Sequence, residues 1–333
     1  MSQAQMKVGK FELSIQAKDL IILPPYKGST LRGGFGNAFK KIVCALKEKD
    51  CPDCILKEQC VYSYIFETPP PAGAKMMRKY PSVPHPFIIE PPMERRMGYK
   101  PGDDMAFGLT LIGKAIDYLP YFIYTFDELG NIGIGKGRGK YRLKTVFQKK
   151  TTPMPLAHCR ACRLEEDTQL YASETRKLSH FNPESLAVDI EPRDDRDEQT
   201  TVLTLNFLSP TRIYYSNHLT CDLEFHILIR QLLRRISMLS YFHCGIDPSV
   251  WDFKGCIEKG KNVAIKNRNL RWYGWERYSA RQDQKIDMGG FVGEITYEGN
   301  LAPFMSLIKA GEILHVGKGT TFGLGKYQIQ DHR

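Results

Sequence analysis

Hydrophobic residues in the first part of the chain follow two spacings, one typical of strands and one typical of helices. Residues 11–17 alternate apolar and polar positions, which predicts a strand buried on one face. Residues 21–28 contain two prolines and a glycine and predict a loop. Residues 31–46 then carry apolar side chains at helical spacing, with Ser29 or Thr30 as the expected N-cap. The pattern therefore predicts a strand, a loop and a helix.

The next hundred residues extend this pattern. Residues 84–92 are bounded by prolines and predict an edge strand, and residues 105–111 predict a further strand. Residues 112–129 show helical spacing despite Pro120. A glycine-rich segment, Gly133-Ile-Gly-Lys-Gly-Arg-Gly-Lys-Tyr141, follows this predicted helix and precedes a predicted strand at 142–147.

The whole pattern recurs in the second half of the chain. Gly139-Lys-Tyr141 returns as Gly325-Lys-Tyr327, a shift of 186 positions, and the strand at 11–17 corresponds to residues 202–208. The two predicted helices correspond to residues 223–241 and 301–310. Each half thus has the element order of a ferredoxin-like unit. We predict an α+β protein with two ferredoxin-like (RRM-like) domains in tandem, residues 1–147 and 200–333. Residues 148–199 are the predicted linker, with hairpins.

The second glycine-rich segment, residues 317–327, contains four glycines and two lysines. Glycines let backbone N–H groups face an anion such as phosphate, although a tight turn between strands is the simpler interpretation. The spacing does not fit a P-loop, and a dinucleotide-binding loop would leave a strand and open a helix. The candidate phosphate-binding residues in the two segments are Lys136, Arg138, Lys140, Gly317, Lys318, Gly319 and Lys326.

The composition narrows the class of partner. The 333 residues are 42% hydrophobic and 25% charged, which is typical of a globular protein, and the formal net charge is +10. This charge points to an anionic partner, and nucleic acid is favoured over membrane because no basic amphipathic segment stands out. We expect no transmembrane helix, no signal peptide and a cytoplasmic location in a prokaryote, where the nine cysteines stay reduced or bind metal.

Four cysteines lie close together in the sequence. Cys44, Cys51, Cys54 and Cys60 fall within seventeen residues and predict a small metal-binding insertion at 44–60 in the first domain. Structural zinc is the preferred metal, with an iron–sulfur cluster or metal-free thiols as alternatives. A second pair, Cys159 and Cys162, follows His158 and provides either two of the four ligands or a separate site.

Basic and aromatic residues alternate between positions 266 and 281. Arginine and lysine neutralise phosphates while aromatic rings stack on bases, so this mixture is typical of RNA binding. The alternative is a pair of strands with Trp272 and Trp275 in the core. The candidate RNA-binding residues here are Arg268, Arg271, Arg277 and Arg281.

These features together resemble a known family, the CRISPR-associated endoribonucleases of the RAMP superfamily that process precursor CRISPR RNA. The similarity is carried by residues 31–36 (Leu-Arg-Gly-Gly-Phe-Gly), the cysteine cluster, and residues 135–141, 277–282 and 315–325. It implies binding of CRISPR repeat RNA, a possible place in a CRISPR effector complex, and metal-independent cleavage. In that reaction a 2′-hydroxyl attacks the phosphate and leaves 2′,3′-cyclic phosphate and 5′-hydroxyl ends.

The chain departs from this family in its candidate catalytic residues. Relatives often carry a histidine on the first helix or in the loop before it, whereas this chain has no histidine before His85. Tyr26 matches a loop tyrosine of some relatives, and Lys40 or Lys41 falls where the helix histidine is expected, with Arg32 nearby. His315 is the other candidate acid or base. Packing roles for Tyr26 and His315 are the alternatives.

Two other functions remain open at this stage. One is a RAMP subunit that holds CRISPR RNA without cutting it, which the missing histidine favours. The other is a metalloenzyme that acts on nucleic acid through the cysteine site.

Overall fold

The computed structural model describes residues 4–47, 50–150, 167–188, 200–279 and 284–330. The chain divides into two compact units, Lys7–Ser185 and Met1–Met6 with Leu186–Arg333. Arg281 and the pair Cys159 and Cys162 lie outside the described residues. Each unit is described by itself below.

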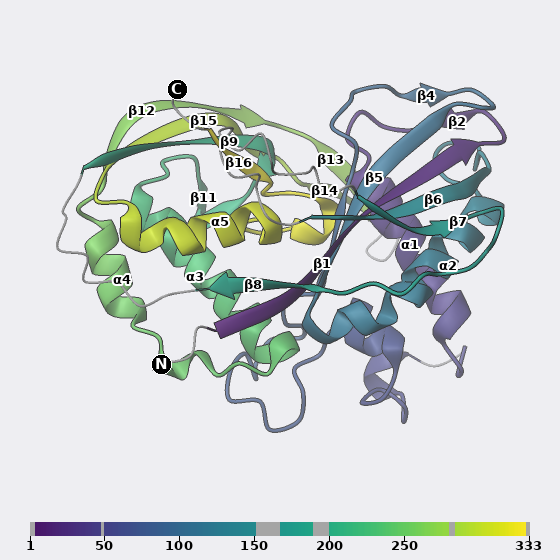
Figure 1. Ribbon diagram of the computed structural model, residues 1–333, viewed down its shortest axis with the longest axis horizontal. Coiled ribbons are helices and arrows are strands. Elements are labelled where there is room, and N and C mark those ends of the chain that lie inside the picture. Colours follow the sequence, from purple (N-terminus) through teal and green to yellow (C-terminus); the bar gives the residue numbers. More distant parts are fainter. Residues whose placement is uncertain (1–3, 48–49, 151–166, 189–199, 280–283, 331–333) are drawn as a thin grey trace, which may run out of the picture. The chain divides into compact units, whose positions relative to one another are not determined.

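The first unit is built on an antiparallel sheet with two helices on one face (Figure 1). The strand order is β3 (Phe87–Glu90), β5 (Asp104–Ile112), β1 (Ala4–Ala17), β6 (Tyr141–Lys149) and β7 (Thr168–Ala172), and β8 (Glu184–Val188) also pairs with β1. The helices are α1 (Gly28–Val43) and α2 (Leu119–Ile132). Shorter elements are the paired strands β2 (Ile21–Ile22) and β4 (Gly98–Tyr99) and the helical turns Cys51–Asp53, Ser63–Glu67 and Gly113–Tyr118.

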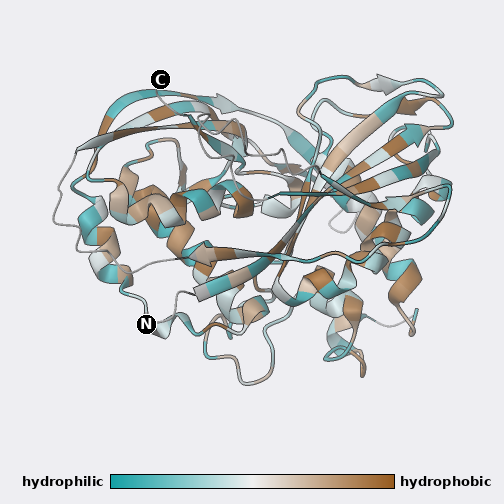
Figure 2. Ribbon diagram, viewed as in Figure 1, coloured by the Kyte–Doolittle hydropathy of each residue, from teal (hydrophilic) through white to brown (hydrophobic). Residues whose placement is uncertain are grey.

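Alternation along β1 provides one side of the core of this unit. Phe11, Leu13 and Ile15 are buried, as the pattern predicted, and hydrophobic and polar bands alternate along the strands in Figure 2. From α1, Phe35 stacks on Phe122 of α2 with a centroid distance of 4.7 Å. The aromatic contacts hold α1 and α2 together over the sheet.

The start of α1 differs from the prediction. The helix begins at Gly28, its N-cap is Lys27, and no side chain caps it, so the prediction of Ser29 or Thr30 as N-cap was wrong. Lys27 is fully buried, and its Nζ donates to the main-chain oxygen of Glu94 at 2.7 Å. Burial lowers the pKa of Lys27 below its usual value. The buried lysine ties the helix start to the loop before β4.

The second unit repeats this plan. Its sheet has the order β12 (Ala264–Tyr273), β15 (Gly290–Gly299), β9 (Thr201–Thr211) and β16 (Tyr327–Gln330), and α3 (Phe225–Cys244) and α5 (Met305–Leu314) pack beside one another on one face (Figure 1). Helix α4 (Phe253–Gly260) packs on α3. Hairpins β10 (Ile213–Tyr215) with β11 (His218–Thr220) and β13 (Glu276–Ser279) with β14 (Gln284–Asp287), and the turns Pro248–Val250, Ala302–Phe304 and Thr320–Phe322, complete the unit.

Both sheets place their four main strands in the same order. In chain order within each unit these are the second, third, first and fourth strands, with a helix after the first and a helix after the third. The predicted class, a mixture of helices with antiparallel sheets, is confirmed. The strand order agrees with the ferredoxin-like pattern predicted from the repeat.

Hydrogen bonds show that the two glycine-rich segments are structurally equivalent. We call residues 133–140 the first glycine loop and residues 315–326 the second glycine loop. Each follows a helix and returns to the sheet through matching backbone bonds and a matching tyrosine hydroxyl. The pairs are Ile134 N to Gly139 O (3.0 Å) with Val316 N to Gly325 O (3.0 Å), Lys136 N to Ile22 O (2.9 Å) with Lys318 N to Arg212 O (2.9 Å), Lys18 N to Lys140 O (2.9 Å) with Leu208 N to Lys326 O (2.9 Å), and Tyr141 Oη to Phe126 O (2.7 Å) with Tyr327 Oη to Ile308 O (2.6 Å).

Among the described residues, no helix is both long enough and apolar enough to cross a membrane.

Candidate functional site

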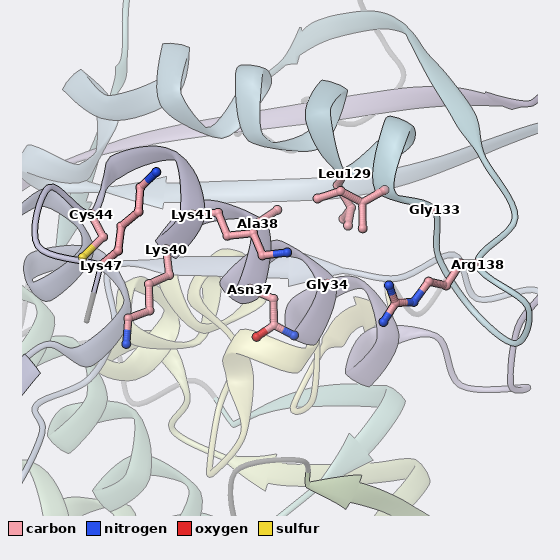
Figure 3. Close-up of a pocket in the computed structure, with 11 residues that line it drawn as sticks. Gly34, Asn37, Ala38, Lys40, Lys41, Cys44, Lys47, Leu129, Gly133 and Arg138 are labelled. Carbon is pink, nitrogen blue, oxygen red and sulfur yellow. The ribbon is translucent and has the colours of Figure 1, made fainter. Parts of the chain in front are cut away.

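A pocket of about 600 Å³ lies in the first unit between α1, the end of α2 and the first glycine loop (Figure 3). Helical spacing explains the contribution of α1, because positions 34, 37, 38, 41 and 44 follow one another along adjoining sides of the helix. The lining residues are Gly34, Asn37, Ala38, Lys40, Lys41, Cys44, Lys47, Leu129, Ile132, Gly133 and Arg138.

The charged side chains of this pocket are all cationic. Lys40, Lys41 and Lys47 come from α1 and the segment after it, and Arg138 comes from the first glycine loop. No carboxylate and no imidazole is among these described lining residues. In Figure 3 the side chains of Lys41 and Arg138 extend from opposite sides into the space in front of Leu129. Converging cations without an acidic neighbour attract an anion such as a phosphodiester.

Backbone bonds fix the first glycine loop and thereby place Arg138. The loop is held at Lys136, whose N–H donates to Ile22 O at 2.9 Å, and Arg138 N–H donates to Gly135 O at 3.3 Å. Arg138 has φ of 52°, an uncommon left-handed conformation for a residue with a side chain. Lys136, Arg138 and Lys140 are exposed. The tip of the loop therefore presents its cations to solvent.

Two cations of α1, Arg32 and Lys40, lie over aromatic rings, whereas Lys41 does not take part in these contacts. Arg32 lies with its Cζ 4.4 Å from the centre of the Phe66 ring, and Lys40 Nζ lies 5.7 Å from the centre of the Tyr62 ring. Tyr62 and Phe66 stack on each other at 5.3 Å. Cation–π contacts thus occupy Arg32 and Lys40, and only Lys40 also lines the pocket. Of the predicted catalytic residues, the pocket brings together Lys40 and Lys41.

Tyr26 lies in the loop before α1 and is half-buried. It is not among the residues that line the pocket. Its role in the chemistry stays a prediction.

His315 is fully buried at the end of α5. Its Nδ1 lies 3.0 Å from the main-chain oxygen of Leu324, and its φ is 58°. On α3, Arg235 donates through Nε to Leu314 O at 2.6 Å, and burial lowers the pKa of Arg235 to about 9. These contacts fix the end of α5 and the second glycine loop. The geometry favours the packing role for His315, since no part of its side chain reaches solvent.

Most of the second glycine loop is also buried. Residues 320–325 are buried, Lys326 is half-buried, and Lys318 is exposed between the half-buried Gly317 and Gly319. Lys318 Nζ lies 3.8 Å from the centre of the Tyr214 ring. Solvent therefore reaches the second glycine loop mainly at residues 317–319 and at Lys326.

Strand β12 carries several exposed basic residues. Arg268 and Arg271 are exposed, and Arg268 pairs with Asp222. Trp272 is 48% exposed, so the alternative that places it in the core is wrong. Arg277 is half-buried, with its Cζ 4.9 Å from the centre of the Phe322 ring, and burial lowers its pKa.

The predicted zinc site is not supported by the structure. All four thiols, Cys44, Cys51, Cys54 and Cys60, are described and only partly buried, yet no three His, Cys, Asp or Glu side chains in the described part of the chain form a group that could hold a metal ion. Burial raises the pKa of Cys51 above its usual value. The raised pKa opposes formation of the thiolate that would bind a metal. Spacing in the sequence was a poor guide because Cys44 ends α1 and instead faces the cationic pocket.

The sequence analysis did not predict that Lys47, Asn37 and Ile132 belong to this site. Lys47 lies beyond α1 and is not part of a motif, Asn37 is a single polar residue on a helix, and Ile132 lies in the final turn of α2. The helical spacing of Asn37 and Lys41 was the one available signal.

Comparison with known proteins gives a separate family match for each half of the chain. Residues 6–179, more than half of the chain, match the AF_1859_N family, described as an N-terminal domain. Residues 205–327 match the family described as CRISPR-associated endoribonuclease Cas6. An uncharacterized protein of Archaeoglobus fulgidus is 22% identical over 315 residues, which are 92% of this chain and 93% of that protein.

Solved structures show the same fold. The Thermus thermophilus Cas6 (TTHB231) product complex aligns over 97% of this chain and 100% of that chain, with a TM-score of 0.54 and 15% identity. A partial Cas6-RT-Cas1–Cas2 complex aligns over 98% of this chain and 46% of that chain, with a TM-score of 0.55 and 13% identity. The family predicted from the motifs is confirmed. The chain belongs to the AF_1859_N family, and its residues 205–327 form a domain that matches the CRISPR-associated endoribonuclease Cas6 family.

Proposed function

We propose that this protein cleaves precursor CRISPR RNA within its repeats, with two ferredoxin-like domains in tandem as the RNA-binding scaffold. The observation that carries this proposal is the pocket lined by Lys40, Lys41, Lys47 and Arg138, in which Lys41 and Arg138 extend toward one another (Figure 3). A scissile phosphate placed there meets several cations and no carboxylate. Because the pocket lies on α1 and a glycine loop, the elements that carried the family resemblance also form the site.

The proposed reaction is metal-independent attack by a 2′-hydroxyl on the adjacent phosphate. Negative charge increases on the phosphate oxygens in the transition state, and Lys41 and Arg138 stabilise it from opposite sides. The attacking 2′-hydroxyl gives its proton to solvent water, the P–O5′ bond breaks, and the leaving 5′ oxygen takes a proton that Tyr26 or a lysine of α1 donates. The products are 2′,3′-cyclic phosphate and 5′-hydroxyl ends.

RNA outside the cut contacts both units in this proposal. Lys136, Lys140 and Lys318 hold backbone phosphates, and β12 offers Arg268 and Arg271 beside the exposed ring of Trp272. Arg277, packed on Phe322, supports the second glycine loop. The partner is CRISPR repeat RNA, and the Cas6-RT-Cas1–Cas2 assembly among the similar structures suggests further CRISPR proteins as partners.

The test uses labelled repeat RNA in the presence of EDTA. We expect cleavage of the natural repeat and none of a repeat with a 2′-deoxy nucleotide at the cut. Lys41→Ala should slow cleavage by about a hundredfold, because it removes one charge-assisted contact made in the transition state. Lys57→Ala is the matched control, since Lys57 is exposed and donates to Pro52 O away from the pocket. Equal cleavage of the deoxy substrate would refute the 2′-hydroxyl mechanism.

A second function is favoured by one observation. The described lining residues include no histidine, which is the usual acid or base for this chemistry. We therefore keep the hypothesis of a Cas6-type subunit that binds repeat RNA and holds it uncut. Tight binding of the repeat with no product after many hours would support this function over cleavage.

A further inference from the structure

The cationic pocket has a second property beyond its charge, an apolar wall beside the cations. Ala38 and Leu129 are buried at the junction of α1 and α2, and Ile132, in the last turn of α2, is 37% exposed. Phosphate makes no use of such a surface. An apolar surface next to cations suits a group that joins a phosphate to a hydrophobic ring.

The packing of α1 on α2 buries most of Ala38 and Leu129, so Ile132 carries the exposed part of this wall. Gly34 has no side chain, and a Cβ built there lies 3.1 Å from Leu129 Cδ2. Any larger residue at this position would press against Leu129 and project into the same space. The neighbouring Gly33 has nothing within 4 Å of its built Cβ, so the constraint belongs to position 34 and not to the whole turn.

The size of the pocket also favours a small organic molecule over a phosphate ion. Ligand pockets for small organic molecules span about 300–1,000 Å³. A volume of about 600 Å³ lies within this range and is several times larger than a phosphate group needs. Asn37 adds an amide that can both donate to and accept from the edge of a base.

We propose that this pocket holds one nucleotide extruded from the RNA. Its phosphate lies between Lys41 and Arg138, and its base lies against Ile132 at the exposed end of the apolar wall. Enzymes that act on nucleic acid commonly take a single base out of the stack and read it against apolar side chains. This inference deepens the proposed function, on which the identity of the ligand as RNA rests.

The pocket is tested with free nucleotides, which need no cleavage to bind. The probes are the four nucleoside 3′-monophosphates and inorganic phosphate, measured by calorimetry or competition on the full chain. We expect at least one nucleotide to bind about tenfold or more tightly than phosphate. Ile132→Ala should weaken the binding of that nucleotide about fivefold, because apolar contact is lost, and should leave the affinity for phosphate unchanged.

Matched variants distinguish binding in the pocket from non-specific attraction of anions to the positively charged chain. Ile55→Ala is the control for Ile132→Ala, since Ile55 is 81% exposed and does not line the pocket. Arg138→Ala should weaken nucleotide and phosphate binding alike, by tenfold or more. Arg176→Ala, at an exposed arginine with a similar left-handed backbone that does not line the pocket, should leave both affinities unchanged.

The possible results bear on the two proposals separately. If all four nucleotides bind no better than phosphate, or if Ile132→Ala and Ile55→Ala behave alike, the nucleotide pocket is refuted even when repeat RNA is cut. If nucleotides bind as expected and repeat RNA stays intact, the cleavage proposal fails and the nucleotide pocket stands. Thermal melting of each variant shows whether it is folded, and both isoleucines lie outside the buried core.

Discussion

Two glycines of the first glycine loop offer a direct test of how this loop presents Arg138. Gly135 and Gly137 have almost the same left-handed backbone, with φ of 73° and 81°. Their surroundings differ. A Cβ at Gly135 would lie 2.1 Å from Ile22 O, whereas a Cβ at Gly137 meets nothing within 4 Å. Replacing each by alanine therefore separates backbone strain, common to both, from the close approach that only Gly135 makes.

The structure sets the size of the expected effects. Left-handed backbone costs alanine about 1–2 kcal/mol at either position. At Gly135 the methyl group also displaces Ile22 O, the acceptor of the Lys136 N–H, and this adds about 2 kcal/mol from the lost bond and the shift of the strand. Local opening of the loop should then become about thirtyfold more frequent in Gly135→Ala than in Gly137→Ala.

Hydrogen exchange of the backbone amides measures this opening. The amides of Ile134 and Lys136 donate to Gly139 O and Ile22 O, so their protection reports whether the loop is closed. We expect strongly accelerated exchange at both amides in Gly135→Ala, together with weaker nucleotide binding because Arg138 loses its fixed position. Equal acceleration in the two variants would show that the contact with Ile22 does not hold the loop.

Three further predictions concern stability. Tyr141→Phe and Tyr327→Phe each remove a buried hydroxyl that donates to a carbonyl of α2 or α5, and each should lower the free energy of unfolding of its own unit by about 1–2 kcal/mol in urea. Burial raises the pKa of both tyrosines, so above pH 10.0 the folded chain keeps protons that the unfolded chain loses. The stability of the unsubstituted chain should therefore fall above this pH, and it should fall less steeply in the two phenylalanine variants. Burial lowers the pKa of Lys27, so stability should rise as pH approaches 10.5 from below, and Lys27→Met should flatten this rise in pH-dependent urea titrations. Gly36→Ala places a methyl group 2.1 Å from an aromatic ring and should lower the melting temperature by several degrees, whereas Gly33→Ala, with open space around it, should leave it unchanged or raise it.

Much of the fold could be predicted because periodicity reflects burial. The alternation of residues 11–17 and the spacing of Phe35 and Phe39 each correspond to one buried face, and the structure contains β1 and α1 at these positions. The start of α1 could not be predicted in the same way. A side-chain cap is a local signal, whereas Lys27 is placed by a long-range bond to Glu94.

The site was less predictable, because its residues come from distant parts of the sequence. Nearly one hundred residues separate Lys41 from Arg138, and the packing of α1 on α2 brings them to one pocket. Burial also decides what a titratable residue can do. His315 stood beside a glycine-rich segment in the sequence, but its ring is enclosed and directed to Leu324 O.

The repeat predicted that both glycine loops bind phosphate, and the structure shows that their tips differ in length and in exposure. Matching bonds hold both loops, yet the correspondence changes from 182 positions at Lys136 and Lys318 to 186 positions at Gly139 and Gly325, so the second loop is four residues longer. The added length forms the buried turn Thr320–Phe322 and leaves Lys318 as the exposed cation of the second loop, whereas Lys136, Arg138 and Lys140 of the short first loop are all exposed. Since matching bonds hold both loops, most of this difference arises from the tips. A duplicated frame has thus given one tip that packs within its own unit and one that places Arg138 in a cationic pocket.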